Sequence, residues 1–117
     1  MAKRKARPIL EDMLAYAEEA RAILGERDGP ALRADRIHLL AVTRAVEIVG
    51  EAANQLPNEI AQQLPIDLHP AIAMRHRLIH GYDSASADII AKTVREDFPA
   101  FVASLRAILA APLPDGS

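Results

Sequence analysis

Apolar residues recur at helical spacing along most of the chain. Between residues 8 and 24 they return in steps of three and four, which predicts a helix with one buried face. Pro8 suits the first turn of this helix, and Gly25 suits its end. The apolar positions of the stripe are Leu10, Met13, Ala17, Ala20 and Leu24.

The longest predicted helix covers residues 31–56 and carries two apolar ridges. Two ridges indicate a central helix that is covered on two sides. Gly50 lies in its middle, where glycine costs about 1 kcal/mol relative to alanine. We therefore expect another helix to cross closely at Gly50. The ridges are Ile37, Ala41, Ala45, Ile48, Ala52 and Leu56, and Leu39, Val42, Val46, Val49 and Ala53.

Three further helices are predicted in the second half of the chain. Prolines bracket a short helix at 58–64, and a helix of about three turns begins at Pro70. The last helix follows Ser86, a good N-cap, and its apolar stripe keeps its register through Pro99. One kinked helix is therefore expected there rather than two. No segment alternates with the period of a β-strand, so the prediction is an all-α bundle of four to five helices.

The length of 117 residues suits one domain with a single core. Residues 1–7 are expected to form a flexible basic arm, either solvated or in contact with phosphate. Residues 8–111 form the predicted helical domain, and residues 112–117 are expected to be a disordered tail.

Composition and charge exclude several classes of protein. Cysteine is absent, which rules out disulfides and thiolate metal sites and fits a cytoplasmic protein. No apolar run approaches the roughly 20 residues that span a bilayer, so no membrane association is expected. The net charge of -2 argues against wholesale coating of nucleic acid, but a local basic site remains possible.

Candidate chemistry is concentrated in residues 75–82, which hold two Arg, two of the four His and one of the two Tyr. His76 and His80 are one helical turn apart. Arg75 and His80 differ by roughly 140° around an ideal helix. They can meet if the arginine curls back, if the helix frays at Gly81, or if a second copy of the helix faces the first. A homodimer is therefore part of the functional hypothesis.

The spacing of these residues is compatible with four interpretations. His-x-x-x-His is a metal-ligand spacing, for which Asp83 is the nearest carboxylate. Arg and His together can cleave RNA without a metal, because His moves protons and Arg stabilises a phosphate. The same groups could bind an anion without reacting. They could also be a solvated helix end whose charges favour the helix dipole.

The pattern Arg75-His76-x-x-x-His80-Gly81-Tyr82 resembles the R-x4-H-x-Y motif of the HepT-like HEPN proteins, small all-helical ribonuclease toxins. Residues 44–53 and 97–99 also resemble that family. The resemblance implies a HEPN-like homodimer with a composite cleft, in which Arg75 and His80 cleave RNA and His76 supports them. It implies no metal or other cofactor.

The resemblance also implies a partner and a modification site. The partner would be a nucleotidyltransferase antitoxin that adenylylates Tyr82, placing an anionic group beside the cleft. Without the resemblance, Tyr82 would be interpreted as a packing residue at a helix end.

Other polar residues have two possible roles. Glu47 and Glu51 form either a solvated stripe satisfied by Arg44 or a pair that orients Arg75 or His80. His69 is expected in the loop before the helix of Arg75. The alternative function is a non-catalytic subunit that binds a nucleotide or docks an antitoxin.

Overall fold

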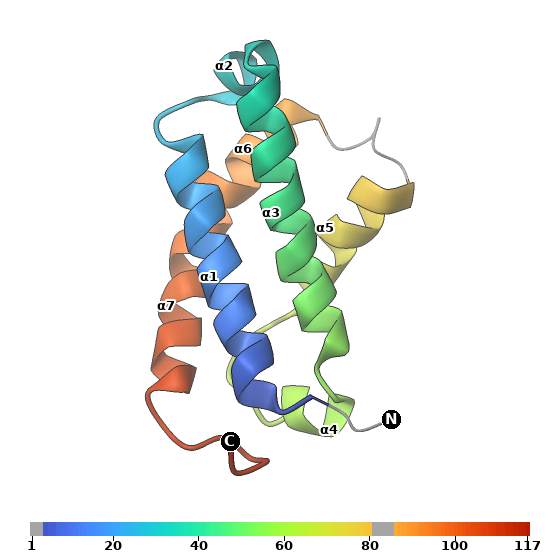
Figure 1. Ribbon diagram of the computed structural model, residues 1–117, viewed down its shortest axis with the longest axis vertical. Coiled ribbons are helices and arrows are strands. Elements are labelled where there is room, and N and C mark those ends of the chain that lie inside the picture. Colours follow the sequence, from blue (N-terminus) through green and yellow to red (C-terminus); the bar gives the residue numbers. More distant parts are fainter. Residues whose placement is uncertain (1–3, 81–85) are drawn as a thin grey trace.

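The computed structural model describes residues 4–80 and 86–117, and all regular structure in these ranges is helical (Figure 1). This confirms the prediction of an all-α, single-domain protein. None of the described helices is both long and apolar enough to cross a membrane. The elements are α1 (Ala6–Leu24), α2 (Gly29–Ala34), α3 (Arg36–Gln55), α4 (Asn58–Ala61), α5 (His69–His80), α6 (Ala87–Lys92), the π-helix η2 (Thr93–Asp97) and α7 (Phe98–Leu109).

Helices α1 and α3 run in opposite directions through the centre of the bundle, with α7 beside α1 and α5 beside α3 (Figure 1). All five apolar positions predicted for the first helix are buried, together with Ala6 and Ile9. The helix ends at Gly25, which has φ 58° and donates its N–H to the Arg21 carbonyl at 3.0 Å. The periodicity therefore identified the buried face and the end of α1 correctly.

The predicted helix over residues 31–56 is wrong in one respect, because it is divided at Asp35 into α2 and α3. The Asp35 backbone is not helical (φ -112°, ψ 87°), and its Oδ1 accepts from the His38 N–H at 3.2 Å. Its Oδ2 lies 2.8 Å from His38 Nδ1. The His38 side chain, and after it the His38 amide, are the main causes of the lowered pKa of the Asp35 carboxyl. A capping aspartate thus begins a new helix within an apolar pattern that continues on both sides of it.

The last helix is continuous from residue 87 to residue 109, as expected, and Ser86 caps it by accepting from the Ile89 N–H at 3.3 Å. The anticipated kink takes the form of the π-helical turn η2, which ends immediately before Phe98-Pro99. Proline lacks an N–H, and its ring clashes with the carbonyl four residues earlier. A wider turn at that point relieves the clash while Val94 and Phe98 stay buried.

The expectation of a disordered tail at residues 112–117 is not met. Leu113 is buried, and two side chains of the tail accept hydrogen bonds from the first amides of α1. Asp115 Oδ2 lies 2.8 Å from the Ala6 nitrogen, and Ser117 Oγ lies 3.1 Å from the Arg7 nitrogen. Hydrogen bonds from the Ser117 hydroxyl and from the Ala6 and Ser117 amides lower the pKa of Asp115 to about 2. The tail therefore caps the start of α1.

The flexible arm expected over residues 1–7 is shorter than the sequence suggested. Residues 6 and 7 belong to α1, and the Arg4 guanidinium lies 3.0 Å from Asp12 Oδ2 and 3.3 Å from Gln55 Oε1. Residues 1–3 lie outside the described part of the chain. Arg4 thus contacts the first and third helices.

Candidate active site on helix α5

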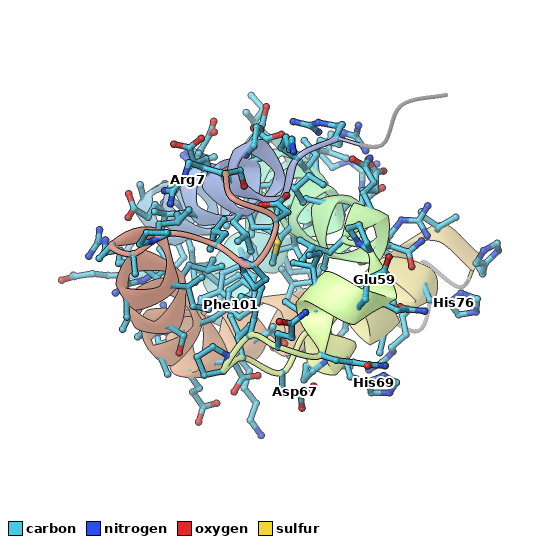
Figure 2. All side chains as sticks on the ribbon, turned by 90° about the horizontal axis from the view of Figure 1, so that it is seen from below. Arg7, Glu59, Asp67, His69, His76 and Phe101 are labelled. Atoms are coloured by element: carbon cyan, nitrogen blue, oxygen red, sulfur yellow. The ribbon has the colours of Figure 1, made fainter. Side chains whose placement is uncertain are left out.

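Helix α5 begins one residue before the position that the sequence predicted. Asp67 Oδ1 accepts a hydrogen bond from the His69 N–H at 3.0 Å, and Pro70 follows in the first turn, where no donor is needed. His69 is therefore the first residue of the helix and not a loop residue. Its side chain is exposed, as is that of His76, which projects from α5 away from the bundle (Figure 2).

One face of α5 packs on the core and the other faces solvent. Met74 and Leu78 are buried, one turn apart, in the same apolar cluster as Val46 and Val49 of α3. The side chains at 76, 77, 79 and 80 are exposed. The apolar positions thus orient the helix so that its ionisable residues are accessible.

The predicted close crossing at Gly50 is confirmed. A β-carbon at Gly50 would lie 2.4 Å from the β-carbon of Arg75 and 2.6 Å from the Ala71 carbonyl oxygen. Real β-carbons do not approach other atoms so closely, so only glycine allows α5 to lie at this distance from α3. Gly50 therefore fixes the backbone position of Arg75.

Replacing Gly50 with alanine should destabilise the protein. Overpacking costs about 1–3 kcal/mol, and the better helix propensity of alanine returns about 1 kcal/mol. Because the added β-carbon would lie 2.4 Å from the β-carbon of Arg75, we expect the upper end of the overpacking cost, so that the free energy of unfolding, measured by urea titration, falls by about 2 kcal/mol. Asn54→Ala, at an exposed position of the same helix, should change it by less than about 0.5 kcal/mol. A Gly50→Ala variant as stable as the wild type would contradict the close crossing.

The Arg75 side chain is half-buried against α3, and no carboxylate in the described residues pairs with it. Its Nε is buried and donates to no acceptor among these residues. A buried donor without an acceptor costs about 1–3 kcal/mol, which is more commonly tolerated at functional sites than elsewhere. Among the described residues, Arg75 thus has no carboxylate counter-ion, although its backbone is held against α3.

His76 and His80 lie against each other on the exposed face of α5. Their ring centroids are 4.5 Å apart, and the ring planes are inclined by 46°. No hydrogen bond, ion pair or ring contact in the described residues joins Arg75 to His80. Within one chain, therefore, the structure brings the two histidines together but leaves Arg75 on another side of the helix. Gly81, Tyr82 and Asp83 lie outside the described residues.

Glu47 and Glu51 pair with a residue of their own helix. Arg44 Nη1 lies 3.6 Å from Glu47 Oε2 and 3.2 Å from Glu51 Oε1. Neither glutamate forms an ion pair with Arg75 or His80 in the described part of the chain. Arg44 thus relieves the repulsion between two carboxylates one turn apart. These contacts favour the interpretation of a solvated stripe.

A groove of about 470 Å³ borders the other side of α5. Its apolar walls come from α3, α5 and α7, and include Val46, Val49, Met74, Phe98 and Phe101. Asp67, Glu96 and Asp97 also line it, and these carboxylates disfavour the phosphates of RNA. The sequence did not predict this groove, because its residues come from segments far apart in the chain and share no local pattern.

Comparison with known proteins shows the family to which the chain belongs. The family model described as "Ribonuclease HepT-like" matches residues 13–108. A "Probable ribonuclease HepT" from Thermococcus cleftensis is 34% identical over 103 residues, which cover 83% of this chain and 89% of the relative. The "Putative RNase MJ1380" of Methanocaldococcus jannaschii is 29% identical over 100 residues, covering 85% and 92%. No solved structure gives a significant match. The chain belongs to the HepT-like ribonuclease family of HEPN proteins.

Proposed function

We propose that this protein is a metal-independent endoribonuclease toxin of a toxin–antitoxin system, active in the cytoplasm. The observation that carries the proposal is the fixed position of Arg75 at the Gly50 crossing, with His76 and His80 accessible on the same helix. Membership of the HepT-like ribonuclease family supports RNA as the substrate.

The chemistry needs a proton carrier and a fixed cation. The His80 imidazole takes the proton from a ribose 2′-hydroxyl, and the freed oxygen attacks the adjacent phosphorus. The bond from phosphorus to the 5′-oxygen breaks, and that oxygen gains a proton from an imidazolium or from solvent. The products are a 2′,3′-cyclic phosphate and a 5′-hydroxyl. Arg75 binds the phosphate oxygens, whose charge grows in the transition state.

The active form is a homodimer whose cleft combines residues of two copies. In the ranges that the structure describes, three large apolar side chains are exposed: Ile37 (78%), Leu40 (54%) and Ile79 (41%). The first two lie in the N-terminal part of α3, and Ile79 lies in the last turn of α5. Because α3 and α5 run in opposite directions, these parts point toward the same end of the bundle (Figure 1). If these three side chains were buried against a second copy, helix α5 of that copy would lie beside Arg75 and His80 of the first copy.

Within this cleft, His76 supports His80 through the ring contact, while Glu47 and Glu51 hold the Arg44 side chain on α3. Tyr82 follows His80 by two residues, so an adenylyl group on its phenol oxygen would bring a bulky anion to the cleft. A nucleotidyltransferase antitoxin would thereby neutralise the toxin. An intact-mass measurement on protein produced with such a partner should show added AMP that maps to Tyr82.

Cleavage of RNA in the presence of a chelator tests the proposal directly. Wild-type protein, purified without a tag and incubated with excess EDTA, should cut single-stranded RNA into fragments that end in a cyclic phosphate. Activity that disappears with EDTA and returns with a divalent ion would contradict the metal-independent mechanism.

The groove beside α5 favours one alternative, a non-catalytic subunit that binds a nucleotide or docks an antitoxin. Its apolar walls and acidic rim suit a protein segment with apolar and basic side chains better than a nucleotide. A protein without RNA cleavage that still binds the nucleotidyltransferase after Arg75 and His80 are replaced would support this alternative.

A further inference from the structure

The histidine pair on α5 has a second chemical capacity besides proton transfer. We propose that His76 and His80 form a two-ligand site for a divalent ion that prefers nitrogen ligands, such as Ni²⁺, Cu²⁺ or Zn²⁺, and that the bound ion inhibits the protein. The binding site rests on the geometry of this pair alone. Its inhibitory effect rests also on the proposed ribonuclease function.

The distance between the rings suits chelation of one ion. A metal–nitrogen bond of about 2.0–2.1 Å places the centre of an imidazole ring about 3.2 Å from the ion. Two ring centres 4.5 Å apart then subtend an angle of about 90° at the ion. This is the angle between neighbouring ligands in the square-planar and octahedral geometries that Cu²⁺ and Ni²⁺ adopt. A tetrahedral ion would need the two ring centres about 5.2 Å apart, so the rings would have to move apart by less than a further 1 Å.

The surroundings of the pair leave it accessible. Both side chains are exposed, so each ring can rotate to direct a nitrogen at the ion without displacing core residues. The ring planes are inclined by 46°, which chelation allows because the ion must lie in the plane of each ring separately. The described residues offer no cluster of three or more His, Asp or Glu that could enclose an ion. Within the described part of the chain, water would therefore supply the remaining ligands, and such an ion would exchange readily.

An ion at this site would stop proton transfer by His80. The lone pair of the ligating nitrogen would be held by the metal and could not accept a proton from a 2′-hydroxyl. The same ion would also prevent the approach of that hydroxyl. Metal would thus act as a reversible inhibitor of a reaction that does not need it.

Calorimetric titration with Ni²⁺ of the full-length, tag-free protein tests the binding site. We expect saturable binding of one ion per chain, with affinity reduced by at least about tenfold in His76→Gln and in His80→Gln, since each removes one of two ligands. His69→Gln, an exposed histidine at the other end of α5, should bind like the wild type. Unchanged affinity in both pair variants, or no saturable binding up to about 1 mM Ni²⁺, would overturn the site.

Inhibition is measured in parallel with RNA cleavage. Cleavage by the wild type and by His69→Gln should fall with Ni²⁺ over the concentration range of binding, and EDTA should restore it. Cleavage that continues with saturating Ni²⁺ would overturn the inhibitory role. Absence of cleavage even without metal would count against the proposed function, whereas the calorimetric result would still decide the site.

Discussion

RNA cleavage should fall by about 10²–10⁴-fold when His80 is replaced by glutamine, because glutamine cannot carry a proton between the 2′-hydroxyl and the leaving oxygen. His80 is exposed at the end of α5, so the substitution should leave the free energy of unfolding within about 0.5 kcal/mol of wild type. Cleavage is measured under single-turnover conditions with excess EDTA. His69→Gln, on the same helix, serves as the matched control and should remain active.

Replacing Arg75 should also reduce RNA cleavage, but alanine is not a suitable substitution at this position. The aliphatic part of its side chain packs against Gly50, so alanine would remove packing as well as charge. Arg75→Met keeps most of the packing and should still reduce cleavage by about 10²–10³-fold, since a donor to the transition state is lost. Arg21→Ala, an exposed arginine of α1, is the control. Retained cleavage in Arg75→Met or in His80→Gln would exclude that residue from the catalytic machinery.

Leu40→Asp should convert the protein to a monomer and abolish RNA cleavage. In a two-fold symmetric interface each residue occurs twice, so one substitution buries two unpaired carboxylates. We expect the dimer dissociation constant, measured by analytical ultracentrifugation, to rise by at least about 100-fold. Leu40 is 54% exposed in the single chain, so the monomer itself should fold.

Ala15→Asp places the same charge on an exposed position of α1 and should leave the dimer and the activity intact. A Leu40→Asp variant that remains dimeric would show that the α3 patch is not the interface. A monomeric variant with full cleavage would instead show that one chain contains a complete site.

The sequence predicted the parts of the fold that local physical chemistry determines. Buried stripes in α1 and in the last helix follow from periodicity, and the crossing at Gly50 follows from the cost of glycine within a helix. The division at Asp35 was missed because the apolar spacing continues across it, and only the side-chain bonds of Asp35 show that a new helix begins there. Ile37 was assigned to a buried ridge but is 78% exposed, because helical spacing alone does not show where along a helix the packing partners end.

Features that join distant segments could not be predicted. Asp115 caps the first turn of α1 although the two residues of the hydrogen bond, Ala6 and Asp115, are 109 positions apart in the sequence. The polar tail gives no local signal of that contact. For the candidate site, the sequence identified Arg75, His76 and His80 and the angle that separates the first from the last. It could not show that no carboxylate of the described residues pairs with Arg75, because that depends on which carboxylates the fold brings near. Glu47 and Glu51 were plausible counter-ions, but Arg44 lies closer on the same helix face.

If one cleft takes Arg75 from one copy and His80 from another, mixing two inactive variants should restore activity. Arg75→Met and His80→Gln chains are unfolded together and refolded, so that about half of the dimers contain one chain of each kind. These mixed dimers possess one intact Arg75 and one intact His80, on different chains. We expect the mixed dimers to cleave RNA at least about tenfold faster than either variant refolded alone. Mixed dimers no more active than the separate variants would contradict it, because the two residues would then have to act from the same chain.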